Sequence, residues 1–138
     1  MGSNPAAPTI QVGKRYAPGM SISAIFAAIA GVVHVGFFVL ESFLFTKPAG
    51  RKIFATSEAD AETMKFFAFN QGFYNLFLAL GCFYGIATGE RTLVIFTCAC
   101  MVGAAAILGT GGKKFVRGVV MQGAPPLIAI VTMLASTR

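Results

Sequence analysis

Four long apolar runs separated by short polar segments dominate the hydrophobic pattern of the chain. They cover about residues 22–45, 66–87, 92–108 and 118–134. Each is near the roughly 20 residues that a helix needs to cross about 30 Å of hydrocarbon. Backbone groups in lipid must be paired within their own segment, and the runs lack the alternation of barrel strands. The pattern therefore predicts an all-α fold, a transmembrane four-helix bundle in a single domain of residues 21–138.

The polar segments between the runs predict how the helices are connected. Residues 46–56 include a Lys-Pro-Ala-Gly-Arg-Lys sequence, which predicts a turn with three cations at the level of the lipid headgroups. Ser57, followed by acidic residues that include Asp60, is typical of a helix N-cap, so the second helix is expected to begin outside the bilayer. The link 88–91 is so short that spans two and three must be antiparallel neighbours.

Composition and charge support a membrane protein over a soluble or nucleic-acid-binding one. The chain has 138 residues, of which 56% are hydrophobic and 12% charged, far from the balance of a soluble domain. The net charge is +6, but the cations flank apolar runs and have no interleaved aromatic surface. No nucleic-acid partner is therefore expected. Residues 1–20, which are polar and contain several prolines, are expected to form a flexible N-terminal tail.

The distribution of cations also predicts an orientation. The rule that cationic loops stay in the cytoplasm favours cytoplasmic loops 46–65 and 109–117, in a plasma or inner membrane. These loops carry seven cations against four on the other side: Lys47, Arg51, Lys52, Lys65, Lys113, Lys114 and Arg117 against Lys14, Arg15, Arg91 and Arg138.

Small residues predict where helices approach closely. Gly81, Gly85 and Gly89 recur every four residues on the second span, and Ala27 and Gly31 do so on the first. Packing within the bundle is the favoured interpretation, with a homodimer face as the alternative.

The three cysteines give no sign of a metal site. Cys82, Cys98 and Cys100 lie inside apolar runs and lack the spacing of metal ligands. They are expected to be buried thiols, and neither a metal nor another cofactor is predicted.

Ionisable and amide side chains gather on three of the predicted spans. His34 and Glu41 are seven residues apart, on one helix face and about 10 Å apart along the axis. An intramembrane carboxylate or imidazole is costly to bury, so these two are the candidate catalytic residues. The candidate substrate-binding residues are Asn70, Gln71, Tyr74 and Asn75 on the second span and Gln122 on the fourth.

Counting from the loop side places these residues at two depths. Glu41, Asn70 and Gln122 are expected about four or five residues inside the membrane boundary, and His34 and Asn75 about nine to eleven residues inside it. The agreement predicts a shared intramembrane pocket, although interhelical hydrogen bonding is a structural alternative for the amides. Glu41 also has the alternative of pairing with a loop cation.

Two consecutive prolines occur at the depth of this predicted pocket. Pro125 and Pro126 leave the carbonyls of Met121 and Gln122 without their helical donors. Such carbonyls either line a site, as in broken membrane helices, or belong to an ordinary kink.

Several motifs resemble a bacterial-type family of small four-span membrane proteins catalogued as a domain of unknown function, some of whose members are labelled epimerase. The motifs are H-x-x-F-x-x-L-E from His34, N-Q-G-x-Y-N from Asn70, the loop that follows Thr46 and the Gln-Gly-Ala-Pro run from Gln122. The sequence departs from the family pattern at Ser42 to Phe45, where Met and Trp are expected, and at the doubled proline. The resemblance covers nearly the whole chain after about residue 23 and implies the four-span fold and the polar positions.

Three functions are compatible with the sequence. The favoured one is an acid/base isomerase or epimerase of a lipid-soluble substrate, in which His34 and Glu41 move protons and the amides with Tyr74 bind a polar group. The alternatives are a small transporter of protons, ions or solutes, and an accessory subunit of a larger membrane complex. The expected partners are a membrane lipid or another hydrophobic small molecule, and a homo-oligomer or larger membrane complex.

Overall fold

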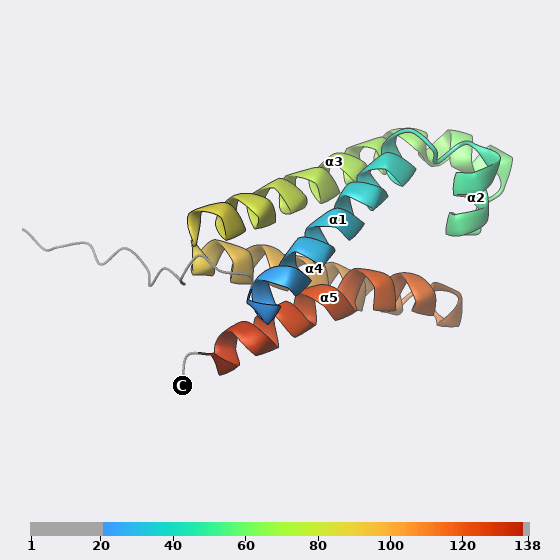
Figure 1. Ribbon diagram of the computed structural model, residues 1–138. Coiled ribbons are helices and arrows are strands. Elements are labelled where there is room, and N and C mark those ends of the chain that lie inside the picture. The colour runs from blue at the N-terminus through green and yellow to red at the C-terminus, as the bar shows by residue number, and fades with distance from the viewer. Residues whose placement is uncertain (1–20, 137–138) are drawn as a thin grey trace, which may run out of the picture.

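The computed structural model describes residues 21–136, and the predicted N-terminal tail lies outside them. The described chain is helical throughout its length, with short connections (Figure 1). The helices are α1 (Ile22–Ser42), α2 (Pro48–Phe54), α3 (Glu58–Thr88), α4 (Arg91–Gly109) and α5 (Val116–Ala135), with a single 3₁₀ turn, η1 (Lys113–Phe115), before α5.

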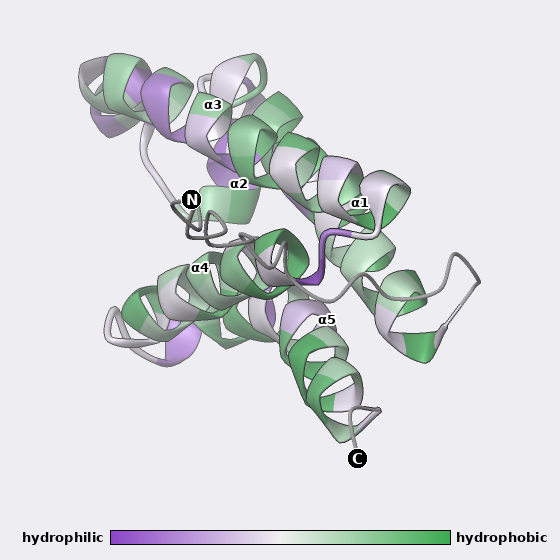
Figure 2. Cartoon of the chain, turned by 90° about the vertical axis from the view of Figure 1, so that its left-hand side faces the viewer, coloured by the Kyte–Doolittle hydropathy of each residue, from purple (hydrophilic) through white to green (hydrophobic). Residues whose placement is uncertain are grey.

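The predicted all-α, four-span fold is confirmed. Within residues 21–136, four helices, α1, α3, α4 and α5, are long and apolar enough to cross a membrane. Figure 2 shows long apolar stretches along them, with polar residues concentrated at α2, the first turns of α3, the α3–α4 link and the α4–α5 connection. The chain is therefore a multi-pass membrane protein.

The four long helices form a ring in which each packs against two others. α1 packs against α3 and α5, and α4 packs against the same two helices. The α3–α4 contact confirms that the second and third spans are neighbours. α2 and the α4–α5 connection lie at one end of the bundle, and the short α3–α4 link lies at the other (Figure 1).

Glycines allow close helix contact in the half of the bundle near the α3–α4 link. A Cβ at Gly31 would lie 2.6 Å from the Phe83 ring, and one at Gly85 would lie 2.8 Å from Val94. Gly81 likewise faces Thr97 on α4. The prediction that small residues pack within the bundle is confirmed at these positions. Gly89 has a different role, because it ends α3 with a φ of 70°.

The apolar core occupies this same half of the bundle. Its members are small or flexible side chains, which suits helices that approach closely. They are Ala27, Ala30, Cys82, Val94, Cys98, Met101, Ala129 and Met133. Cys82 and Cys98 are buried free thiols, as predicted, whereas Cys100 is half-buried.

The segment between α1 and α3 differs from the predicted turn. Residues 48–54 form helix α2, with Pro48 in its first turn and Arg51 and Lys52 in its last, where cations complement the helix dipole. Ala55 ends α2 in the left-handed conformation. The predicted cap at Ser57 is confirmed, because its hydroxyl oxygen accepts a hydrogen bond of 3.1 Å from the amide of Asp60.

The α1–α3 pair and the α4–α5 pair diverge toward the end that carries α2 (Figures 1 and 2). The first half of α3 consequently has few neighbours, and Phe66, Phe67 and Tyr74 are exposed there. Glu41 at the end of α1, and Asn70, Gln71, Tyr74 and Asn75 of α3, lie in this more open half.

Candidate functional site

Glu41 and Asn75 are joined across the α1–α3 interface. The Asn75 amide nitrogen donates a hydrogen bond of 2.7 Å to Glu41 Oε2. Asn75 is buried and Glu41 is half-buried, so the pair is shielded on one side and accessible on the other. Asn75 was expected at the depth of His34, and its contact with Glu41 corrects that assignment.

The register of α1 against α3 explains this pairing. Gly72 faces the last turn of α1, where a Cβ would lie 3.1 Å from the Phe38 carbonyl oxygen and would collide with the Ser42 hydroxyl. The Ser42 hydroxyl donates to the Phe69 carbonyl at 3.3 Å. With Gly72 against Ser42, the residue one turn deeper on α3 is Asn75, opposite Glu41.

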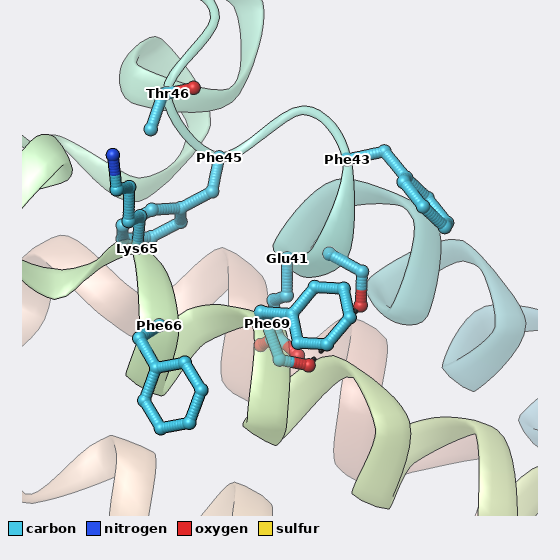
Figure 3. Close-up of a pocket in the computed structure, with 8 residues that line it drawn as sticks. Glu41, Phe43, Phe45, Thr46, Lys65, Phe66 and Phe69 are labelled. Atoms are coloured by element: carbon cyan, nitrogen blue, oxygen red, sulfur yellow. Dashed lines mark hydrogen bonds between the residues drawn. The ribbon is translucent and has the colours of Figure 1, made fainter.

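A cavity of about 320 Å³ opens beside Glu41 (Figure 3). Its size falls at the lower end of the range for small-molecule sites, which runs from about 300 to 1,000 Å³. It combines aromatic walls with a few polar groups, and is lined by Glu41, Ser42, Phe43, Phe45, Thr46, Lys65, Phe66 and Phe69. Among the predicted site residues, Glu41 alone belongs to this lining.

Most of the residues that line the cavity were not predicted from the sequence. Phe43, Phe45 and Thr46 belong to the irregular segment after α1, which the sequence placed partly inside the first span. They meet Lys65 and Phe66 because the chain turns back through α2 before α3 begins. Lys65 could have been proposed from the sequence as a cavity residue, because it is the last cation before the apolar part of α3.

His34 is separate from this cavity and lies inside the bundle. Its side chain is 0% exposed, and Nδ1 lies 2.8 Å from the carbonyl oxygen of Ala30 on the same helix. Nε2 is buried and has no hydrogen-bond partner among residues 21–136. His34 lies about 10 Å from Glu41 along α1, so no direct contact joins the two candidate catalytic residues.

Replacing His34 with leucine tests whether the imidazole stabilises the bundle. An unpaired buried polar atom costs about 1–3 kcal/mol, whereas an apolar group of similar size has no such cost. We expect His34→Leu to unfold in detergent at a temperature equal to or above that of the wild type. A clear fall in that temperature would mean that Nε2 has a stabilising partner, such as a bound water.

The other amides do not converge on Glu41. Gln122 is buried on α5, beside Gly123, which faces Ala105 of α4. Asn70, Gln71 and Tyr74 are exposed on α3. Gln71 lies seven residues before Leu78, and Tyr74 lies seven residues before Gly81, so both share the helix face that contacts α4 near Gly81. At the level of Gln71 and Tyr74, α4 has diverged from α3, and this face is exposed. Their role in substrate binding stays a prediction.

The doubled proline lies within a continuous helix. α5 runs from Val116 to Ala135 through both Pro125 and Pro126, and Pro126 is buried. Proline lacks the amide donor, so the carbonyls of Met121 and Gln122 lose their helical partners without the helix ending. A part for these carbonyls in a site stays a prediction.

Metal-ligating groups do not cluster in the described part of the chain. Between residues 21 and 136, no three His, Cys, Asp or Glu side chains come close enough together to hold an ion. The candidate site is therefore best described as one carboxylate, one amide and an aromatic cavity at the membrane-surface end of α1 and α3.

Comparison with known proteins places the chain in a family. Residues 28–134 match the family described as protein of unknown function, DUF1304, and the chain belongs to it. No curated protein and no solved structure matches the chain.

Proposed function

We propose that this four-span member of DUF1304 binds a lipid-soluble molecule in the cavity between α1 and α3, and isomerises it by moving a proton at Glu41. The observation that carries the proposal is a half-buried carboxylate, fixed by the 2.7 Å hydrogen bond from Asn75, on the wall of a cavity with aromatic sides. An apolar cavity with a few convergent polar groups is the usual form of a small-molecule site.

Glu41 has the features of a general base. Asn75 orients the carboxylate through Oε2. Oε1 has no hydrogen-bond partner among residues 21–136, and Glu41 lines the cavity, so Oε1 is free to meet a ligand. The carboxylate accepts a proton from a carbon that lies between a carbonyl and a double bond and returns it to the far end of that double bond, which moves by one position into conjugation with the carbonyl. One carbon–hydrogen bond breaks and another forms, so the reaction needs no oxidant, reductant or second substrate.

A single-base proton shift suits the geometry better than a two-base epimerisation. Epimerisation with two bases needs a second proton donor on the opposite face of the substrate, and His34, the predicted partner, does not line the cavity. Isomerisation at Glu41 alone is therefore the form of the proposal that the contacts favour.

Transport receives less support from the same arrangement. A transported species needs a path across the bundle, and beyond His34 the interior is filled by the apolar core, including Ala27, Cys82 and Met101, all 0% exposed. On α1 itself, residues 35–40 between His34 and Glu41 carry no polar side chain, so a proton relay along this helix has no intermediate group. The cavity is lined at the end of α1 and the start of α3.

The cavity also has a proposed orientation relative to the membrane. The cations of loops 46–65 and 109–117 favour a cytoplasmic location for α2 and the α4–α5 connection. The cavity would then open near the cytoplasmic surface of a plasma or inner membrane.

Untargeted lipid analysis of protein extracted together with its surrounding membrane tests the binding step. We expect one class of molecule to be enriched over the bulk membrane, and Phe69→Ala to reduce that enrichment about tenfold through loss of an aromatic wall. Phe67→Ala is the matched control, since Phe67 is 73% exposed on the same helix and lies outside the cavity lining. Equal enrichment in both variants, or none in the wild type, would refute binding in this cavity.

The chemical step is tested with the enriched molecule in heavy water. Incubation with the wild-type protein is expected to introduce solvent deuterium at a single carbon and to move a double bond by one position. If the molecule binds but gains no deuterium, binding is supported and isomerisation is refuted.

A further inference from the structure

Two cations, each paired with a carboxylate, lie at the end of the cavity nearest the membrane surface. Lys65 lines the cavity, and Arg51 of α2 contacts its rim at Thr46. The Arg51 guanidinium donates to the Thr46 carbonyl at 2.7 Å and pairs with Glu58 at 3.2 Å. Thr46 also lines the cavity, so Arg51 supports its rim.

The Lys65 ammonium can exchange its present partner for a ligand. Its one ion pair in the described chain is with Glu62, with Nζ and Oε2 2.8 Å apart. Both side chains are largely exposed, Lys65 at 63% and Glu62 at 55%. Exposed pairs of this kind contribute at most about 1 kcal/mol, so an anion at the rim can replace Glu62 as the partner of Lys65.

The Lys65 side chain and the Glu41 carboxylate lie at different depths. Lys65 precedes Asn75, the partner of Glu41, by ten residues, or about 15 Å along α3. Figure 3 places Lys65 and Thr46 toward one side of the cavity and Glu41 and Phe69 toward the other. A bound molecule with an anionic head at Lys65 therefore keeps that head away from the carboxylate, with phenylalanine rings between them.

We propose that the molecule bound in this cavity is an anionic membrane lipid, whose phosphate is bound by Lys65 while its apolar part lies against Phe45, Phe66 and Phe69 and reaches Glu41. The inference rests on the proposed function and names its substrate class. The reacting carbon then belongs to the apolar part of the lipid, and the phosphate serves recognition. An aromatic wall beneath a cation at headgroup level is complementary to a lipid of this kind.

Native mass spectrometry of the full chain with two lipids of identical acyl chains tests the charge requirement. The probes are phosphatidylglycerol, which is anionic, and phosphatidylcholine, which has no net charge. We expect the wild type to prefer phosphatidylglycerol at least tenfold. Lys65→Gln should lower that preference about tenfold, whereas Lys52→Gln, an equal loss of charge on exposed α2, should change it less than twofold. Glu62→Gln, which releases Lys65, should strengthen binding of the anionic lipid.

The same measurements distinguish failure of the anionic-lipid inference from failure of the proposed function. Equal effects of Lys65→Gln and Lys52→Gln would mean diffuse surface attraction and would overturn the inference. Equal binding of the two lipids, with both weakened by Phe69→Ala, would overturn the anionic class but leave the cavity as the binding site. If Phe69→Ala changes the binding of neither lipid, both proposals are refuted. Displacement of phosphatidylglycerol by inorganic phosphate alone would identify a free anion as the ligand.

Discussion

Glutamine in place of Glu41 is expected to slow deuterium incorporation into the bound molecule by about 10²–10⁴-fold, the contribution usual for a general base. The glutamine side chain has nearly the same shape, and its amide oxygen can still accept the hydrogen bond that Asn75 donates. It cannot accept a proton at neutral pH. The molecule should therefore copurify with Glu41→Gln as with the wild type, and only the exchange should be lost. Mass spectrometry of the molecule recovered from heavy water measures both quantities.

The control for Glu41→Gln is the equivalent change at an exposed carboxylate. Asp60→Asn removes one negative charge from an exposed side chain in the first turn of α3 that lies outside the cavity lining. Its exchange rate should match that of the wild type. If Glu41→Gln retains full exchange, Glu41 is not the base, and the proton is moved elsewhere.

Valine at Gly72 is expected to cause a large loss of stability. The added side chain would collide with the Ser42 hydroxyl and press on the Phe38 carbonyl, and backbone atoms of α1 cannot rotate away as a flexible side chain can. Overpacking of this kind costs about 1–3 kcal/mol or more. We expect a lower unfolding temperature in detergent and loss of a single monodisperse species. The separation of α1 from α3 should also break the hydrogen bond between Asn75 and Glu41.

Gly36 provides the matched control for this substitution. It lies in the middle of α1, and a Cβ there would have nothing within 4 Å. Gly36→Val therefore repeats the change in helix propensity without the interhelical collision. Equal stability of the two variants would show that the α1–α3 contact at Gly72 is not tight.

The helices could be predicted because the information for them is local. Each apolar run has the length that a membrane crossing requires, and the Ser57 cap depends on residues within one turn. Helix α2 could not be predicted, because its stability depends on contacts outside it. Gly50 packs so closely on the Leu44 carbonyl that a Cβ would collide, and Arg51 pairs with Glu58 across the connection.

The candidate site was predictable in its residue types and not in its arrangement. The cost of burying a carboxylate and an imidazole in lipid identified Glu41 and His34 from the sequence alone. Their shared helix face did not reveal that one lies at a cavity and the other inside the bundle. That difference depends on which neighbouring helix is present at each depth, and therefore on how the helices cross.

The amino-acid sequence by itself determined that this chain crosses a membrane four times, because hydrophobic length and the need to pair backbone groups act within each segment. The tertiary structure alone decided which polar groups meet. The contact of Gly72 with Ser42 sets the register that brings Asn75 to Glu41, and the divergence of α4 from α3 leaves Gln71 and Tyr74 exposed. Register and crossing angle follow from the packing of two surfaces against each other, which no single helix specifies.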